Sequence, residues 1–178
     1  AVSVTENQTS AITVTSADVD GGAPAYSITG GADSALFAIN TATGVLTFNA
    51  APNYEAPADA GANNVYDVTV QVSDGAGGTD TQAIAVTVTP VDDNAPVITS
   101  NGGGSTATIS LAENTSAVTT VTATDSDLPA QTLAYSISGG ADAALFSINA
   151  STGALTFVAA PDFEAPADAG ADNVYDVT

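Results

Sequence analysis

The chain has 178 residues and a formal net charge of −20, because it contains 20 acidic residues and no lysine, arginine or histidine. A chain without cations cannot neutralise phosphate, which argues against nucleic-acid partners and against binding to anionic membranes. The acidity favours metal cations as partners, or a high-salt environment that screens the repulsion. No apolar run approaches the ~20 residues of a membrane-inserted helix. The chain has no cysteine for a disulfide, and the lack of methionine leads us to expect an internal piece of a longer protein.

Runs of alternating apolar and polar residues predict short β-strands along the first half of the chain. Two clear runs lie within residues 64–75 and 84–89, and shorter ones lie upstream. The alternating residues that we expect to face the core are Ile12, Val14, Tyr26, Ile28, Leu46, Phe48, Tyr66, Val68, Val70, Val72, Ile84, Val86 and Val88. One buried and one solvated face is typical of antiparallel strands in two packed sheets. No segment has helical periodicity, so the predicted fold class is all-β.

The second half of the chain repeats the first. Residues 26–69 return as residues 135–178 with small substitutions at a minority of positions. About seven strands per ~100 residues favour tandem immunoglobulin-like Greek-key β-sandwich domains. We expect a complete repeat over residues 1–94 and a second over 95–178 that lacks the end of strand F and strand G. Open strand edges are costly, so we expect the chain to continue or a neighbouring molecule to supply the strands.

Five short acidic motifs follow one another in a fixed order, and three of them recur at the domain-length period. They are "TEN" and "AEN", "DVD" and "DSD", "PNYE" and "PDFE", "VQVSDG", and the junction "VDDNAPV". Together they resemble the cadherin repeat, and more closely the cadherin-like repeats of large secreted bacterial adhesins. The resemblance covers the whole chain and implies cadherin-type sandwiches, an extracellular or cell-surface location, and calcium as the cofactor.

Matching the motifs position by position, the resemblance implies three groups of metal ligands. Those at the junction are Glu6, Asn53, Glu55, Asp92, Asp93, Asn94, Asp125 and Asp127. Those facing a preceding repeat are Asp18, Asp20 and Asp74, and those facing a following repeat are Glu113, Asp162 and Glu164. Carboxylate, amide and backbone oxygens are the ligands that calcium takes, six to eight at a time.

Two departures from the family pattern lie at this junction. The family usually has an acidic residue in place of Pro90, and Asp in place of Asn53, which Asp162 keeps in the second repeat. We therefore expect fewer ions there than the family usually holds. Aspartate and asparagine are also common turn residues, so a solvated linker without metal remains the alternative interpretation. Asp33 and Asp142 are read as turn residues.

The predicted function is structural. The chain has no histidine, cysteine or lysine to act as base or nucleophile, and no catalytic residue is assigned, so we do not expect an enzyme. We expect a tandem repeat of a stalk, adhesin arm or filament subunit, stiffened by calcium at each junction. Its partners would be neighbouring repeats or copies of itself. The alternative is a carbohydrate-binding or homophilic adhesion module, although the recurring aromatic residues fit core positions better than a sugar platform.

Overall fold

The computed structural model describes residues 2–19 and 21–178. Among these residues there is no α-helix, and the only helical turns are the 3-10 segments η1 (Ser34–Leu36), η2 (Ser100–Gly102) and η3 (Ala143–Leu145). The chain forms two compact units. The first contains Ala1–Asp93 with Asp127–Pro129, and the second contains Asn94–Ser126 with Ala130–Thr178. The prediction of an all-β chain is confirmed, and the division after residue 94 stays a prediction.

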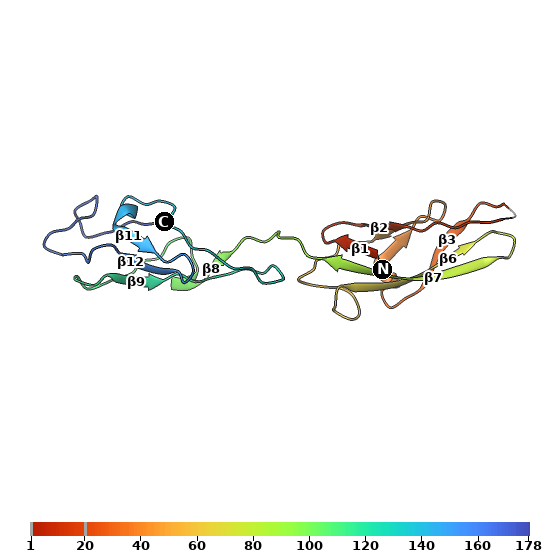
Figure 1. Ribbon diagram of the computed structural model, residues 1–178, viewed down its shortest axis with the longest axis horizontal. Helices are drawn as coiled ribbons and strands as arrows, with labels where there is room; N and C mark the ends of the chain where they lie inside the picture. Colours follow the sequence, from red (N-terminus) through yellow and green to blue (C-terminus); the bar gives the residue numbers. More distant parts are fainter. Residues whose placement is uncertain (1, 20) are drawn as a thin grey trace. The chain divides into compact units, whose positions relative to one another are not determined.

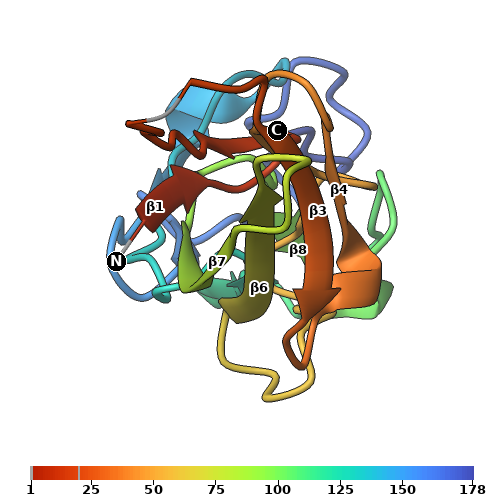
Figure 2. The same ribbon diagram turned by 90° about the vertical axis from the view of Figure 1, so that its right-hand side faces the viewer.

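The first unit contains a four-stranded sheet in the order β1-β7-β6-β3. The strands are β1 (Val2–Thr5), β7 (Thr79–Thr89), β6 (Val65–Ser73) and β3 (Ala25–Gly30). Figure 2 shows β7 between β1 and β6. β6 is antiparallel to both of its neighbours, whereas β1 runs parallel to β7. The expectation of antiparallel strands was therefore wrong for β1, because alternation reports which face is buried and not the direction of the neighbouring strand.

A three-stranded sheet of the order β2-β5-β4 completes the first unit. It consists of β2 (Ser10–Thr13), β5 (Val45–Phe48) and β4 (Phe37–Ile39). The predicted alternation is confirmed, because the following side chains are buried in one core: Tyr26, Leu46, Phe48, Tyr66, Val68, Val70, Ile84, Val86 and Val88. Three aromatic rings meet in this core, and the Phe48 and Tyr66 ring centroids lie 5.1 Å apart, edge to face.

The second unit contains a three-stranded sheet of the order β11-β12-β9 (Figure 1). Its strands are β11 (Phe146–Ile148), β12 (Ala154–Phe157) and β9 (Ala117–Thr120). A short pair, β8 (Val97–Ile98) with β10 (Ala123–Thr124), also belongs to this unit. The buried core is smaller, with Phe146, Leu155 and Phe157 at its centre. Residues 109–112 and 174–178, which correspond to β1 and the start of β6, are not paired as strands.

Candidate metal centres

Glu6 stands directly after β1, and only 1% of the residue is exposed. Its Oε2 accepts a hydrogen bond from the Tyr54 N–H at 2.8 Å, and its Oε1 accepts one from the Val91 N–H at 2.7 Å. The backbone N–H of Glu6 donates to the carbonyl of Thr89 at 3.0 Å. One carboxylate therefore joins the end of β1, the loop before residue 55 and the segment that follows β7. Such charge-assisted bonds are stronger than neutral ones.

Glu55 has one carboxylate oxygen with a hydrogen-bond donor and one without. The backbone N–H of Leu128 lies 3.4 Å from Glu55 Oε1, within the segment that packs with the first unit. Glu55 Oε2 is buried and has no hydrogen-bond partner among the described residues. The neighbouring Asp127 is also buried, with 2% exposed. The chain contains no lysine, arginine or histidine that might compensate these carboxylates. Burying a charge is costly unless it is paired or coordinates a metal, so this donor set fits a hard cation.

Three other predicted ligands of the first unit are exposed and partly engaged locally. The Oδ1 of Asn53 accepts the Ala56 N–H at 2.8 Å. Asp92 and Asp93 follow β7 and are exposed. The side-chain amide of Asn7 donates to Asp93 Oδ2 at 2.5 Å. These oxygens are accessible from solvent, unlike the carboxylate of Glu6.

The two remaining junction residues, Asn94 and Asp125, belong to the second unit. Asn94 is exposed and Asp125 is half-buried. Their participation in a site with the first-unit carboxylates stays a prediction.

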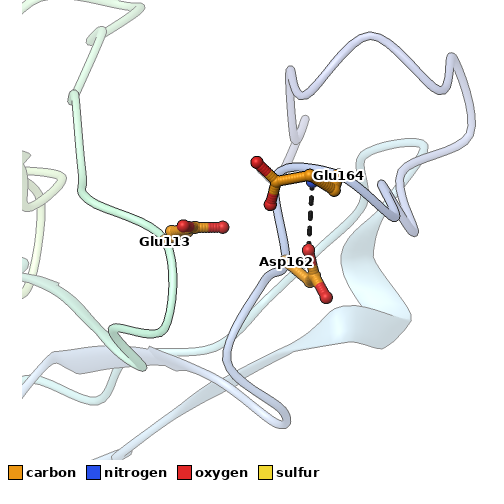
Figure 3. Close-up of side chains that lie close together, drawn as sticks. All are labelled: Glu113, Asp162 and Glu164. Atoms are coloured by element: carbon orange, nitrogen blue, oxygen red, sulfur yellow. Dashed lines mark hydrogen bonds between the residues drawn. The ribbon is translucent and has the colours of Figure 1, made fainter.

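The three acids predicted to face a following repeat lie close together in the second unit. One carboxylate oxygen each from Glu113, Asp162 and Glu164 falls within 4.8 Å of the others. Figure 3 shows Glu113 pointing towards the loop that carries the other two. The Phe163 N–H of that loop donates to Glu113 Oε2 at 2.9 Å, and within the loop the Glu164 N–H donates to Asp162 Oδ1 at 3.0 Å. All three acids are exposed, so the cluster is open to an ion from solvent.

The acids predicted to face a preceding repeat lie at the end of the first unit that carries the β6–β7 hairpin. Asp18 and Asp74 border a hollow of about 300 Å³, and Asp20 lies outside the described residues. Asp74 Oδ1 accepts the three successive N–H groups of residues 76–78 at 2.7 to 3.0 Å. These bonds, led by that from Ala76, hold the pKa of Asp74 below its ordinary value. Asp74 is therefore maintained as an anion at this end of the unit.

Asp33 is not a simple turn residue, contrary to the sequence-based expectation. It is 4% exposed, and its two oxygens accept the N–H groups of Ala60 and Asp67 at 2.7 and 2.8 Å. Asp142 repeats both bonds in the second unit, again at 2.7 and 2.8 Å. The residue therefore anchors a distant loop to the neighbouring strand segment.

A second buried aspartate was missed by sequence reasoning. Asp59 accepts the N–H groups of Asn63 and Asn64, each at 3.0 Å, and its counterpart Asp168 makes the equivalent two bonds. Burial raises the pKa of Asp168, but the donated bonds from residues 172 and 173 outweigh it, so that the pKa lies below its ordinary value. The recurrence of "PADAGA" in both repeats was the available signal. These aspartates stabilise the loop and are not available as metal ligands.

No helix among the described residues has the length and apolar character to cross a membrane. The described aromatic side chains lie in or beside the cores, and Phe163 is the exception, with 64% exposed. The expectation that the recurring aromatic residues serve packing is therefore confirmed for the buried rings and wrong for Phe163.

The chain is similar to solved extracellular fragments of the cadherin superfamily. Extracellular cadherin domains 3–6 of protocadherin gamma B2 are 26% identical, with 89% of this chain and 42% of that chain covered and a TM-score of 0.61. The human protocadherin-24 EC1–2 fragment is 25% identical, with 91% and 76% covered and a TM-score of 0.69. The mouse cadherin-23 EC22–24 fragment is 22% identical, with 92% of this chain and 52% of that chain covered and a TM-score of 0.66. At this identity the likeness supports the fold alone.

The chain thus spans 42% and 52% of the protocadherin gamma B2 and cadherin-23 fragments. No curated protein matches it. The family described as "Cadherin domain" matches residues 1–89, which span the whole of the first sandwich and its acidic motifs. Fold, motif order and family match agree, and the chain belongs to the cadherin domain family.

Proposed function

We propose that the chain is a tandem pair of cadherin repeats that acts as a structural and adhesive segment outside the cell, stiffened by calcium at the end of each repeat. Cadherin domains are extracellular adhesion modules and not enzymes. The segment would belong to a stalk, an adhesin arm or a filament subunit. Its mechanism is mechanical, because a cation shared between oxygens of two repeats restrains the angle between them.

The observation that carries the proposal is the buried Oε2 of Glu55, which has no hydrogen-bond donor among the described residues. It lies on the loop that Glu6 binds through the N–H of Tyr54. In a chain without lysine, arginine or histidine, the ordinary compensation by a cationic side chain does not exist. A divalent cation supplies the missing charge, and calcium accepts carboxylate ligands of this kind.

The proposed junction site comprises the carboxylates of the first repeat together with residues of the linker and the second repeat. Its ligands are Glu6, Asn53, Glu55, Asp92, Asp93, Asn94, Asp125 and Asp127. Equivalent half-sites are Glu113, Asp162 and Glu164 towards a following repeat, and Asp18, Asp20 and Asp74 towards a preceding one. The mutual proximity of Glu113, Asp162 and Glu164 supports the half-site towards a following repeat.

A calorimetric calcium titration of the chelator-treated chain tests the proposal. We expect saturable binding, and we expect E55Q to weaken the tightest site by at least about tenfold, because one liganding charge is lost. D67N is the matched control, since Asp67 is exposed on β6 and belongs to none of the half-sites. Equal binding by wild type and E55Q would sink the assignment of Glu55, and no binding at millimolar calcium would sink the metal site.

Homophilic association is the second candidate function. The similar EC3–6 fragment of protocadherin gammaB7 is described as a cis-dimer structure. A sugar-binding strip has little support, because Phe163 is the one exposed aromatic residue among those described. Sedimentation of the chain over a range of concentrations, with calcium and with chelator, measures self-association directly. A monomer under both conditions would leave the structural role alone.

A further inference from the structure

Asn101 differs from every other asparagine in the sequence, because it alone is followed by glycine. It begins the run "NGGGST", residues 101–106, in which three successive glycines follow it. The run lies between β8 and β9 in the second unit, and Asn101 and the three glycines are exposed. None of the acidic motifs includes this run, so the proposed metal sites leave it without a role.

The backbone of the run is open where the residue after Asn101 would carry a side chain. Asn101 has a φ of 52° and a ψ of 32°, and Gly102 has a φ of 92°. Glycine adopts such a positive φ without steric cost. A Cβ added at Gly102 would find no heavy atom within 4 Å apart from those of its chain neighbours. The peptide between the two residues therefore has room to turn towards the side chain of Asn101.

The backbone nitrogen of Gly102 is a potential nucleophile for the side-chain amide before it. This nitrogen and the Cγ of Asn101 belong to the same chain and close a five-membered ring when they join, so the reaction gains from proximity. A Cβ on the following residue restricts the approach, and glycine has none. Every other asparagine of the chain precedes a residue with a Cβ. Asn101 is therefore the asparagine at which ring closure meets the least steric hindrance.

A hydroxyl group is already placed on the carbonyl oxygen of the Asn101 side chain. Thr119 Oγ1 donates to Asn101 Oδ1 at 3.2 Å. Thr119 is half-buried on β9, where it pairs with Leu155 of β12, so the donor comes from a paired strand and not from the glycine run. Negative charge develops on Oδ1 as a nitrogen adds to Cγ, and a fixed donor stabilises that charge. The bond from Thr119 thus favours attack on this amide.

Asp74 provides a comparison within the chain, because it also precedes a glycine. Its Oδ1 accepts the N–H groups of residues 76–78 at 2.7 to 3.0 Å, and these bonds, led by that from Ala76, hold the pKa of Asp74 below its ordinary value. An ionised carboxylate is a poor electrophile for an amide nitrogen. Of these two steps, only the one at Asn101 presents a neutral carbonyl group to the glycine nitrogen.

We propose that Asn101 is a site of spontaneous modification, at which the side-chain amide is converted into a carboxylate with Gly102 as the internal nucleophile. The Gly102 nitrogen gives its proton to water and forms a bond to Cγ. The bond between Cγ and Nδ2 breaks, and Nδ2 takes up a proton and leaves as ammonia. Water then opens the resulting succinimide at either carbonyl, which gives aspartate or isoaspartate. Both products add a negative charge, and isoaspartate also lengthens the main chain by one carbon after β8.

A time course of the 178-residue chain in chelator tests the proposal at mildly alkaline pH, which favours loss of the N–H proton. Peptide mass spectrometry measures the loss of ammonia and the gain of water at each asparagine. We expect Asn101 to react at least about tenfold faster than any other asparagine, and G102A to slow its reaction at least about tenfold. The proposal is overturned if Asn101 reacts no faster than the others, or if G102A reacts at the wild-type rate.

T119V removes the hydroxyl group and keeps the branched shape of the side chain. In the folded chain it should slow the reaction of Asn101 at least about twofold, because a hydrogen bond to Oδ1 is lost. In concentrated urea T119V and wild type should react equally, whereas G102A should stay slow because its effect is local. T120V is the matched control, since Thr120 is the exposed neighbour on β9, and it should react like wild type.

The part assigned to Thr119 is contradicted if T119V and wild type react equally in the folded chain. It is also contradicted if the slower reaction of T119V persists in urea, because the hydrogen bond to Asn101 exists only in the folded unit.

Discussion

The two units share nearly the same residues over 44 aligned positions, 26–69 and 135–178, and matching motifs upstream of them, but they bury equivalent residues differently. Glu6 is 1% exposed, whereas its counterpart Glu113 is exposed. Leu46 is 0% exposed and its counterpart Leu155 is 8% exposed. The difference follows β7, which covers the first core and whose following segment donates the Val91 N–H to Glu6. The comparison teaches that β7 and the segment after it set both the depth of the first core and the environment of Glu6, one of the predicted ligands.

The largest expected effect comes from replacing Leu46 and its counterpart Leu155 by alanine, which leaves a cavity in each core. L46A should destabilise the first unit by about 3–5 kcal/mol, because the site is fully enclosed and cannot collapse. L155A should cost the second unit about 2–3 kcal/mol, because Leu155 borders an open hollow of about 500 Å³. Unit-resolved hydrogen exchange measures the two values separately. Equal losses would show that β7 does not account for the difference between the cores.

A smaller effect is expected at the paired glutamates. In chelator, E6Q should destabilise the first unit by about 2 kcal/mol, since a charged acceptor of two backbone N–H groups becomes a neutral amide. E113Q should cost the second unit less than about 1 kcal/mol, because Glu113 is exposed to water. Urea unfolding followed by exchange at unit-specific amides provides the comparison. A larger loss for E113Q than for E6Q contradicts the role assigned to the segment after β7.

The buried aspartates should behave alike in the two units, because β7 makes none of their bonds. D33N and D142N remove the same pair of charge-assisted acceptor interactions. Each should cost about 1–3 kcal/mol of the free energy of unfolding. Parallel chemical unfolding of both variants checks the equality. A clear difference would mean that the open hollow beside Leu155 also weakens the loop that Asp142 holds in the second unit.

The smallest effect concerns acid. The pKa of Asp168 is lowered in the folded unit, so the unfolded chain binds more protons and stability from this group is present above the unfolded pKa of about 3.9. That stability is lost as the pH falls through the lower folded pKa. D168N should therefore flatten the pH dependence of the second unit's stability below about pH 4. Urea midpoints of wild type and D168N, measured between roughly pH 2 and pH 6, check this prediction. The same slope against pH in both proteins would contradict the role assigned to Asp168.

Much of the first sandwich was predictable because alternation reports burial directly. Tyr66, Val68 and Val70 on β6 face the core as their spacing predicts. The parallel pairing of β1 was not predictable, because direction depends on a partner more than 70 residues away, as in the match of Val2 with Val86. Asp33 was misread for the same reason, since its two donors lie 27 and 34 residues further along the chain.

The candidate ligands were predictable from the family motifs and not from composition. The sequence identifies Glu113, Asp162 and Glu164 as a group, and the structure brings their oxygens within 4.8 Å of one another. The burial of Glu6 and the unpartnered oxygen of Glu55 depend on how β7 and two loops pack, so spacing alone does not reveal them.

Thermal unfolding of the chain in chelator and in millimolar calcium tests the central claim most directly. An ion that binds the folded form at 100 times its Kd adds about 2.7 kcal/mol to the free energy of unfolding. For a domain of about 60–100 residues, the size of the first unit, each kcal/mol raises the Tm by about 4–8 °C. We predict a calcium-dependent rise of the Tm that E55Q reduces and D67N leaves intact. The same Tm in chelator and in calcium would contradict the account of a cadherin segment held by metal.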